Sequence, residues 1–120
     1  MFAKVKFKTK RRKESIMRRP KIVKALRDIL QRIAPDATAI LYGSEARGEA
    51  HSDSDIDLLI LVNKEKLTLK EEQEITYPLY DIEIDTGVMI NPIVISRKKW
   101  EDLKSRSLFY YNVMKEGVVL

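Results

Sequence analysis

The sequence predicts an α/β (α+β) fold: a small mixed sheet of about three to four strands with flanking helices. Three observations lead to this prediction. One segment carries apolar residues at helical spacing, several short apolar runs are bounded by glycine or polar residues, and the two kinds of segment alternate along the chain. Because 120 residues suffice for a single hydrophobic core, we expect one folding domain.

Composition excludes several classes of protein. With 44% hydrophobic and 34% charged residues, the chain matches a soluble globular protein rather than a disordered one. No apolar run approaches the roughly 20 residues that span a bilayer, so no membrane span is expected. The absence of cysteine excludes disulfides and thiolate chemistry, and it suits a reducing cytoplasm.

Positive charge is concentrated at the N-terminus. Residues 1–21 contain ten Lys or Arg and one acidic residue, whereas the whole chain carries +5, so the remainder is net acidic. We interpret residues 1–19 as a basic N-terminal extension and residues 20–120 as a single domain. A basic extension can be a solvated arm, which we favour, or can bind RNA and other phosphate-bearing ligands.

Residues 20–42 predict a helix followed by a buried strand. Apolar side chains recur at i, i+3, i+4 and i+7 from Ile22 to Ile33, the spacing of an amphipathic helix. Prolines stand at either end, where one suits the first turn and the other stops the helix. The apolar run Thr38–Tyr42 then predicts a strand that turns at Gly43.

The next two elements differ in clarity. Ile56–Val62 predicts a second strand, whose alternate side chains lie on opposite faces. Residues 68–86 carry a helical stripe that ends at Gly87, but Pro78 interrupts it and residues 80–84 alternate as in a strand. We favour the helix and keep the strand as the alternative.

A third strand and two short helices complete the predicted fold. Residues 88–95 are β-branched and apolar, and Pro92 places this strand at a sheet edge or a bulge. Ser96 can cap the short helix that follows. The last helix ends at Gly117, and its apolar stripe comprises Leu108, Tyr111 and Met114.

A glycine-serine pair follows the first predicted strand. Gly43 lets the backbone approach a phosphate closely and adopt a positive φ without strain. Ser44 supplies a hydroxyl and can cap a following helix, whose N-terminal amides favour an anion. Taken alone, such a pair is an ordinary turn.

Two carboxylates open the second predicted strand. The period of two places Asp55 and Asp57 on one face, close enough to share a cation. Neighbouring carboxylates raise each other's pKa unless a metal ion or an arginine compensates. A frayed strand end surrounded by water would explain the pair equally well.

Taken together, the two features resemble the signature of the polymerase-beta-like nucleotidyltransferase superfamily. The resemblance rests on Gly43-Ser44-Glu45-Ala46-Arg47-Gly48 and Ser54-Asp55-Ile56-Asp57-Leu58. The chain is most similar to the small stand-alone branch, the minimal nucleotidyltransferases. This resemblance implies a nucleotidyltransferase-like fold over residues 20–120.

The resemblance also implies a site. Asp55 and Asp57 would be the catalytic residues and would hold Mg²⁺ or Mn²⁺. Gly43 and Ser44 would receive the β- and γ-phosphates of a nucleoside triphosphate (NTP), with ATP as the expected substrate. Arg47 would add charge beside the triphosphate, although a surface arginine paired with Glu45 or Glu49 is an equally open interpretation.

One part of the family pattern is missing. Active members usually carry a third carboxylate on the third strand, where this chain has Asn91, an amide that ligates weakly and cannot act as a base. If residues 80–84 formed a strand instead, three acidic side chains could fill the role, and a solvated helix face is the alternative. They are Asp81, Glu83 and Asp85.

The resemblance implies transfer of a nucleoside monophosphate, AMP above all, from an NTP to a protein or small-molecule hydroxyl. Small members of the family commonly pair with an all-helical HEPN protein as antitoxins of toxin–antitoxin modules. A HEPN-type partner and a homodimer are therefore expectations from resemblance. The alternative is a module that binds nucleotide, metal or a partner with little or no catalytic activity.

Overall fold

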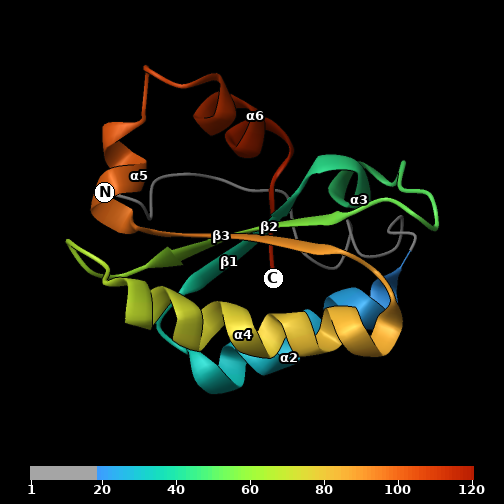
Figure 1. Ribbon diagram of the computed structural model, residues 1–120. Coiled ribbons are helices and arrows are strands. Elements are labelled where there is room, and N and C mark those ends of the chain that lie inside the picture. The colour runs from blue at the N-terminus through green and yellow to red at the C-terminus, as the bar shows by residue number, and fades with distance from the viewer. Residues whose placement is uncertain (1–18) are drawn as a thin grey trace.

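The computed structural model describes residues 19–120, and within them a four-stranded mixed sheet with helices on both faces (Figure 1). The elements in chain order are α2 (Pro20–Ile33), β1 (Thr38–Tyr42), α3 (Gly43–Arg47), β2 (Ile56–Val62), α4 (Leu69–Thr86), β3 (Ile90–Ser96), α5 (Arg97–Asp102), α6 (Leu108–Glu116) and β4 (Val118–Val119). The fold class predicted from the sequence is confirmed.

The strands lie in the order β3-β2-β1-β4. β1 pairs antiparallel with both β2 and β4, whereas β2 and β3 are parallel and are joined through α4. The antiparallel pairing brings the end of β1 and the start of β2 to the same end of the sheet. The segment between them, which contains α3, therefore begins and ends beside one point of the sheet.

Each face of β2 belongs to a different core. α2 and α4 cover one face, where Ile56, Leu58 and Ile60 are fully buried. α5 and α6 cover the other, where Leu59 and Leu61 pack with Trp100 and Val113. The alternation predicted for this strand is confirmed, and since β2 also has a strand on each side, it is the buried centre of the sheet.

Residues 69–86 form one continuous helix, so the strand alternative for residues 80–84 is wrong. Thr68 and Glu71 form a reciprocal capping box at its start, and Gly87 ends it in the left-handed conformation with φ +74°. Pro78 lies inside this helix. The cap signals at both ends and the burial of Ile75 and Leu79 outweigh the local cost of the proline.

The third strand has the predicted place. Among residues 19–120, β3 is an edge strand, which suits Pro92, because an edge strand leaves half of its backbone groups unpaired within the sheet. Ser96 caps α5 as predicted, since its hydroxyl accepts from the Lys99 backbone N–H. The short strand β4 was not predicted from the sequence.

The apolar stripe predicted for the last helix is wrong for Leu108 and Tyr111, whereas Met114 packs against the core as predicted. Leu108 and Tyr111 are 74% and 60% exposed, whereas Val113 is fully buried. The aromatic residues beside them turn α6 inward: Tyr110 packs against Trp100 with ring centroids 4.5 Å apart, and Phe109 packs edge-on against the same indole. Aromatic packing, not the most regular apolar spacing, sets the buried face of this helix.

The basic extension predicted for residues 1–19 lies outside the described residues, apart from Arg19. Its proposed contacts with RNA are therefore a prediction only, as is the boundary of the domain at residue 20. Among residues 19–120, none of the helices is both long enough and apolar enough to cross a membrane.

Candidate functional site

The two halves of the sequence motif meet at one end of the sheet. Tyr42, the last residue of β1, pairs with Asp57 of β2, so the turn that begins at Gly43 lies beside this carboxylate. Gly43 has φ +75°, and a Cβ added to it would lie 2.4 Å from Asp57 Oδ2. Only glycine fits this conformation and this contact without displacement of the carboxylate. The turn and the acidic pair therefore face one another.

Asn91 bridges the two aspartates from the neighbouring strand. It pairs with Asp57 in the parallel register of β2 and β3. Its amide nitrogen donates to Asp55 Oδ2 at 2.9 Å and lies 3.4 Å from Asp57 Oδ1, at the long limit of a hydrogen bond. Three strand-end residues thus place two carboxylates and one amide on a common surface.

The surroundings of Asp57 disfavour the ionised form of its carboxyl group. Burial raises the pKa of Asp57, the hydrogen bond from Asn91 lowers it, and the charge of Asp55 raises it again, with a net upward shift. Burial and the neighbouring charge of Asp57 together raise the pKa of Tyr42 to about 12. A cation at the carboxylates would relieve the desolvation and the repulsion together.

Arg47 reaches the same site from the end of α3. Its Nη1 lies 2.8 Å from Glu116 Oε2 and its Nε 3.5 Å from Glu49 Oε1. The side chain remains 43% exposed, and its positive charge lowers the pKa of Asp57, so it lies within electrostatic reach of the acidic pair. Of the two partners suggested by the sequence, Glu49 lies beside Arg47, whereas the Glu45 carboxylate is bound by Arg19. Glu116 was not foreseen, because 69 positions separate it from Arg47.

Ser44 lies in the first turn of α3 but does not cap it. The residue at the N-cap is Tyr42, and no side chain caps this end of the helix. The backbone carbonyl of Ser44 accepts from the Glu49 N–H at 2.9 Å, which closes the turn after the helix. The capping role predicted for the Ser44 hydroxyl is therefore wrong, and the hydroxyl has no part in holding the helix end.

Other candidates from the sequence lie away from the acidic pair or in the core. Asp81 and Asp85 are exposed on α4, and Glu83 Oε1 accepts from the Ile90 backbone N–H at 2.8 Å. Within residues 19–120 there is no group of three or more His, Asp or Glu side chains placed to hold a metal ion. His51 is exposed in the loop before Asp55, and Trp100 is fully buried in the core.

Comparison with known proteins shows the family to which the chain belongs. The model of a nucleotidyltransferase domain family matches residues 23–117, most of the chain, including both halves of the motif. The chain belongs to the nucleotidyltransferase family. This match confirms the resemblance inferred from the sequence. Members of this family generally act on a nucleoside triphosphate and use a divalent metal ion.

Two relatives illustrate the family. A protein of Methanocaldococcus jannaschii described as a "putative protein adenylyltransferase" is 40% identical over 72 residues, which are 60% of this chain and 66% of that protein. A solved "putative nucleotidyltransferase" from Sulfolobus solfataricus superposes with a TM-score of 0.50 at 20% identity, over 95% of this chain and 87% of the other. The second likeness concerns the fold alone. The chain spans just under two thirds of the length of the Methanocaldococcus protein.

The donor atoms at the site suit the metal that a nucleotidyltransferase uses. Mg²⁺ and Mn²⁺ favour carboxylate oxygens, which Asp55 and Asp57 can offer from one surface. The Asp57 carboxylate is partly desolvated and lies beside the charge of Asp55, so a cation here would neutralise charge that the protein itself disfavours. Mg²⁺ usually retains several waters and shares the phosphates of its substrate, so two protein carboxylates are a sufficient anchor. The roles of Asp55 and Asp57 as ligands stay predictions.

Proposed function

We propose that this nucleotidyltransferase transfers AMP from ATP to a hydroxyl group of a protein or a small molecule, with Mg²⁺ or Mn²⁺ held by Asp55 and Asp57. The choice of AMP and of a protein acceptor is supported by the description of the Methanocaldococcus protein as a protein adenylyltransferase. The observation that carries the proposal is the contact between the turn at Gly43 and the Asp57 carboxylate.

This contact supports a triphosphate site for a steric reason. The Asp57 carboxylate occupies the place that a side chain at position 43 would fill, so only glycine lets the backbone of the turn lie this close to the carboxylate. A metal held by the acidic pair would neutralise the phosphates and align them. The triphosphate would then lie along residues 43–44, with Arg47 available to its terminal phosphates.

The reaction proposed is a single displacement at phosphorus. The acceptor oxygen forms a bond to the α-phosphorus, the α–β anhydride bond breaks, and pyrophosphate leaves with the electron pair of that bond. The hydroxyl proton must pass to Asp55, Asp57 or water, because the amide of Asn91 cannot take it up. The residues of this site contribute position and charge, which are the main sources of catalysis in phosphoryl transfer.

Asn91 also favours a second candidate function. An amide where the family usually has a third carboxylate weakens the metal site and removes one proton acceptor. A module that binds nucleotide and metal with little turnover would tolerate this substitution. Such a module could act on a partner protein by contact. The HEPN-type partner, the homodimer and the cytoplasmic location expected from the sequence are likewise proposals.

One labelling experiment separates the two candidates. The full chain is incubated with Mg²⁺ and each of the four α-labelled NTPs, with cell lysate as the source of acceptors. Transfer of label from ATP that is lost in Asp57→Asn but kept in Asp53→Asn, an exposed loop carboxylate, would support the enzyme. Mg²⁺-dependent ATP binding without transfer would support the module. Absence of both would refute the proposed function.

A further inference from the structure

A buried ion pair lies behind the candidate site, and neither the motif nor the proposed reaction accounts for it. Glu45, the third residue of α3, is 0% exposed, and the Arg19 side chain that faces it is only 11% exposed. The neighbours of Glu45 in sequence, Gly43 and Ser44, form the turn of the site. A buried carboxylate at this position is unfavourable unless it is paired and holds something in place.

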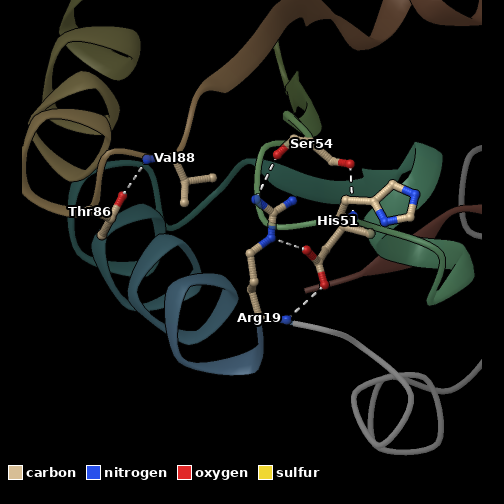
Figure 2. A network of polar contacts seen from close by, with 6 residues as sticks. Arg19, His51, Ser54, Thr86 and Val88 are labelled. Carbon is tan, nitrogen blue, oxygen red and sulfur yellow. Dashed lines mark hydrogen bonds and ion pairs between the residues drawn. The ribbon is translucent and has the colours of Figure 1, made fainter.

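Arg19 binds Glu45 through both its backbone and its side chain. The Arg19 backbone N–H donates to Glu45 Oε2 at 3.0 Å, and Nε donates to Oε1 at 2.6 Å. Arg19, at the start of α2, thus contacts both oxygens of this carboxylate, and the two bonds are among the dashed lines drawn from Arg19 in Figure 2. The carboxylate therefore has a fixed orientation, and with it the helix that starts at Gly43.

The same guanidinium holds the other half of the motif. Arg19 Nη1 donates to the Ser54 carbonyl at 2.6 Å, and the next residue in the chain is Asp55 (Figure 2). Ser54 is itself fixed, because its hydroxyl accepts from the His51 N–H at 2.8 Å and its own N–H donates to the His51 carbonyl at 3.1 Å. The tight turn at residues 51–54 thus ends in a carbonyl anchored to Arg19.

Stability alone is a weak explanation for this arrangement. Replacement of a buried ion pair by apolar side chains of similar volume is often neutral or stabilising, since desolvation offsets the attraction. Moreover, Arg19 Nη2 is buried and has no hydrogen-bond partner among the described residues. The guanidinium is thus oriented for its bonds to Glu45 and Ser54, at the expense of one buried donor.

We propose that Arg19 is a positioning residue of the nucleotidyltransferase site: one guanidinium fixes the distance between the Gly43–Ser44 turn and the Asp55–Asp57 pair. The inference rests on the proposed function, because it assigns a purpose to that distance. Arginine is required for it, since its planar fork reaches two acceptors in fixed directions, whereas the single ammonium of lysine does not.

The test begins with two variants that separate position from stability. Arg19→Lys keeps the charge opposite Glu45 and removes the second arm toward Ser54. The double variant Arg19→Met with Glu45→Met removes both charges, so no unpaired carboxylate is left in the core, and it keeps similar volume. Arg32→Lys is the matched control, because Arg32 is an exposed arginine in the last turn of the same helix.

Amide hydrogen exchange of the full-length variants measures directly how firmly the two segments of the site are held. We expect faster exchange in residues 43–48 and 54–57 of both test variants, with α4 and β3 unchanged and with Arg32→Lys indistinguishable from the parent. A merely structural role would instead accelerate exchange throughout the domain. Unchanged exchange in both segments of Arg19→Lys would overturn the inference, and this variant carries the test if the double variant does not fold.

Mn²⁺ affinity, measured by electron paramagnetic resonance without any nucleotide, shows whether loosening these segments weakens the metal site. Residues behind metal ligands typically contribute ten- to hundred-fold to affinity, so we expect Mn²⁺ to bind about tenfold more weakly in both variants. Parent-like affinity in a folded variant whose segments have loosened would overturn the inference. If the parent protein itself binds no Mn²⁺, the proposed function fails, whereas the exchange measurement still decides whether Arg19 positions the two segments.

Discussion

Gly43 and Asp57 are in direct contact, although 14 positions separate them in the chain. A methyl group at position 43 would lie 2.4 Å from Asp57 Oδ2, well inside van der Waals distance. The contact follows from the antiparallel pairing of β1 and β2, which sets Tyr42 opposite Asp57. Because the strand pairing is fixed by buried residues on both faces of β2, the site geometry is a consequence of the core.

Gly43→Ala should impair metal binding more than it impairs folding. The new methyl would push the Asp57 carboxylate aside, and the positive φ would cost about 1–2 kcal/mol of unfolding free energy. Gly87→Ala is the matched control, since Gly87 has φ +74° and open space around a new Cβ. We expect similar losses of stability in urea for both variants, and Mn²⁺ affinity at least about tenfold lower only in Gly43→Ala. Equal metal affinities would contradict the contact.

Asp57→Asn should raise the melting temperature in metal-free buffer. The pKa of Asp57 is raised by folding, so its ionised form destabilises the folded state at pH values above that pKa and has no effect below the ordinary value of 3.8. The gain should therefore be absent near pH 3 and grow as pH rises above about 4, to a few degrees. Calorimetry across pH, with Asp53→Asn as the control, measures it. A gain independent of pH would refute the assigned cause.

Asn91→Asp should strengthen metal binding and weaken the metal-free protein. A third carboxylate opposite Asp57 in the β2–β3 register replaces a hydrogen-bond donor by a like charge. We expect a lower melting temperature without metal, and a larger increase in it on addition of Mn²⁺ than in the parent. Asn112→Asp, an exposed change of the same charge on α6, controls for net charge. An unchanged response to Mn²⁺ would show that Asn91 does not face the ion.

Arg47 should exchange its carboxylate partner for phosphate when the triphosphate binds. The Arg47–Glu116 pair is partly exposed, so Arg47→Gln and Glu116→Gln should each change stability by less than about 1 kcal/mol. Their effects on ATP affinity should be opposite: several-fold weaker for Arg47→Gln and stronger for Glu116→Gln, because the freed guanidinium is available to the phosphates. Titration calorimetry with Mg²⁺ present measures both. A weaker affinity in Glu116→Gln would argue against the exchange.

The sequence predicted those helices and strands in which apolar residues recur at regular spacing over most of the segment. The stripe of α2 and the alternation of β2 were read correctly, because each buries a regular face against the sheet or the helices. The buried face of α6 was predicted only in part, since its direction depends on the packing of Phe109 and Tyr110 around Trp100. That contact joins separate helices and leaves no local pattern in the sequence.

The same limit applies to the site. Glycine followed by Ser44, and two aspartates at spacing two, are local patterns, and each could be recognised before the fold was known. Arg19 and Glu45 are 26 positions apart, and nothing in the spacing of charges indicates that an arginine before α2 pairs with a buried carboxylate of α3. Glu116 likewise reaches Arg47 only because α6 ends beside α3.

The most direct test is a crystal structure with Mn²⁺ and a non-hydrolysable ATP analogue, in which anomalous scattering locates the ion. We predict one ion bound by both Asp55 and Asp57, with phosphate oxygens among its other ligands and the terminal phosphates against the backbone of residues 43 and 44. An ion elsewhere, or a triphosphate bound away from Gly43 while Asn91 still bridges the two aspartates, would contradict the account.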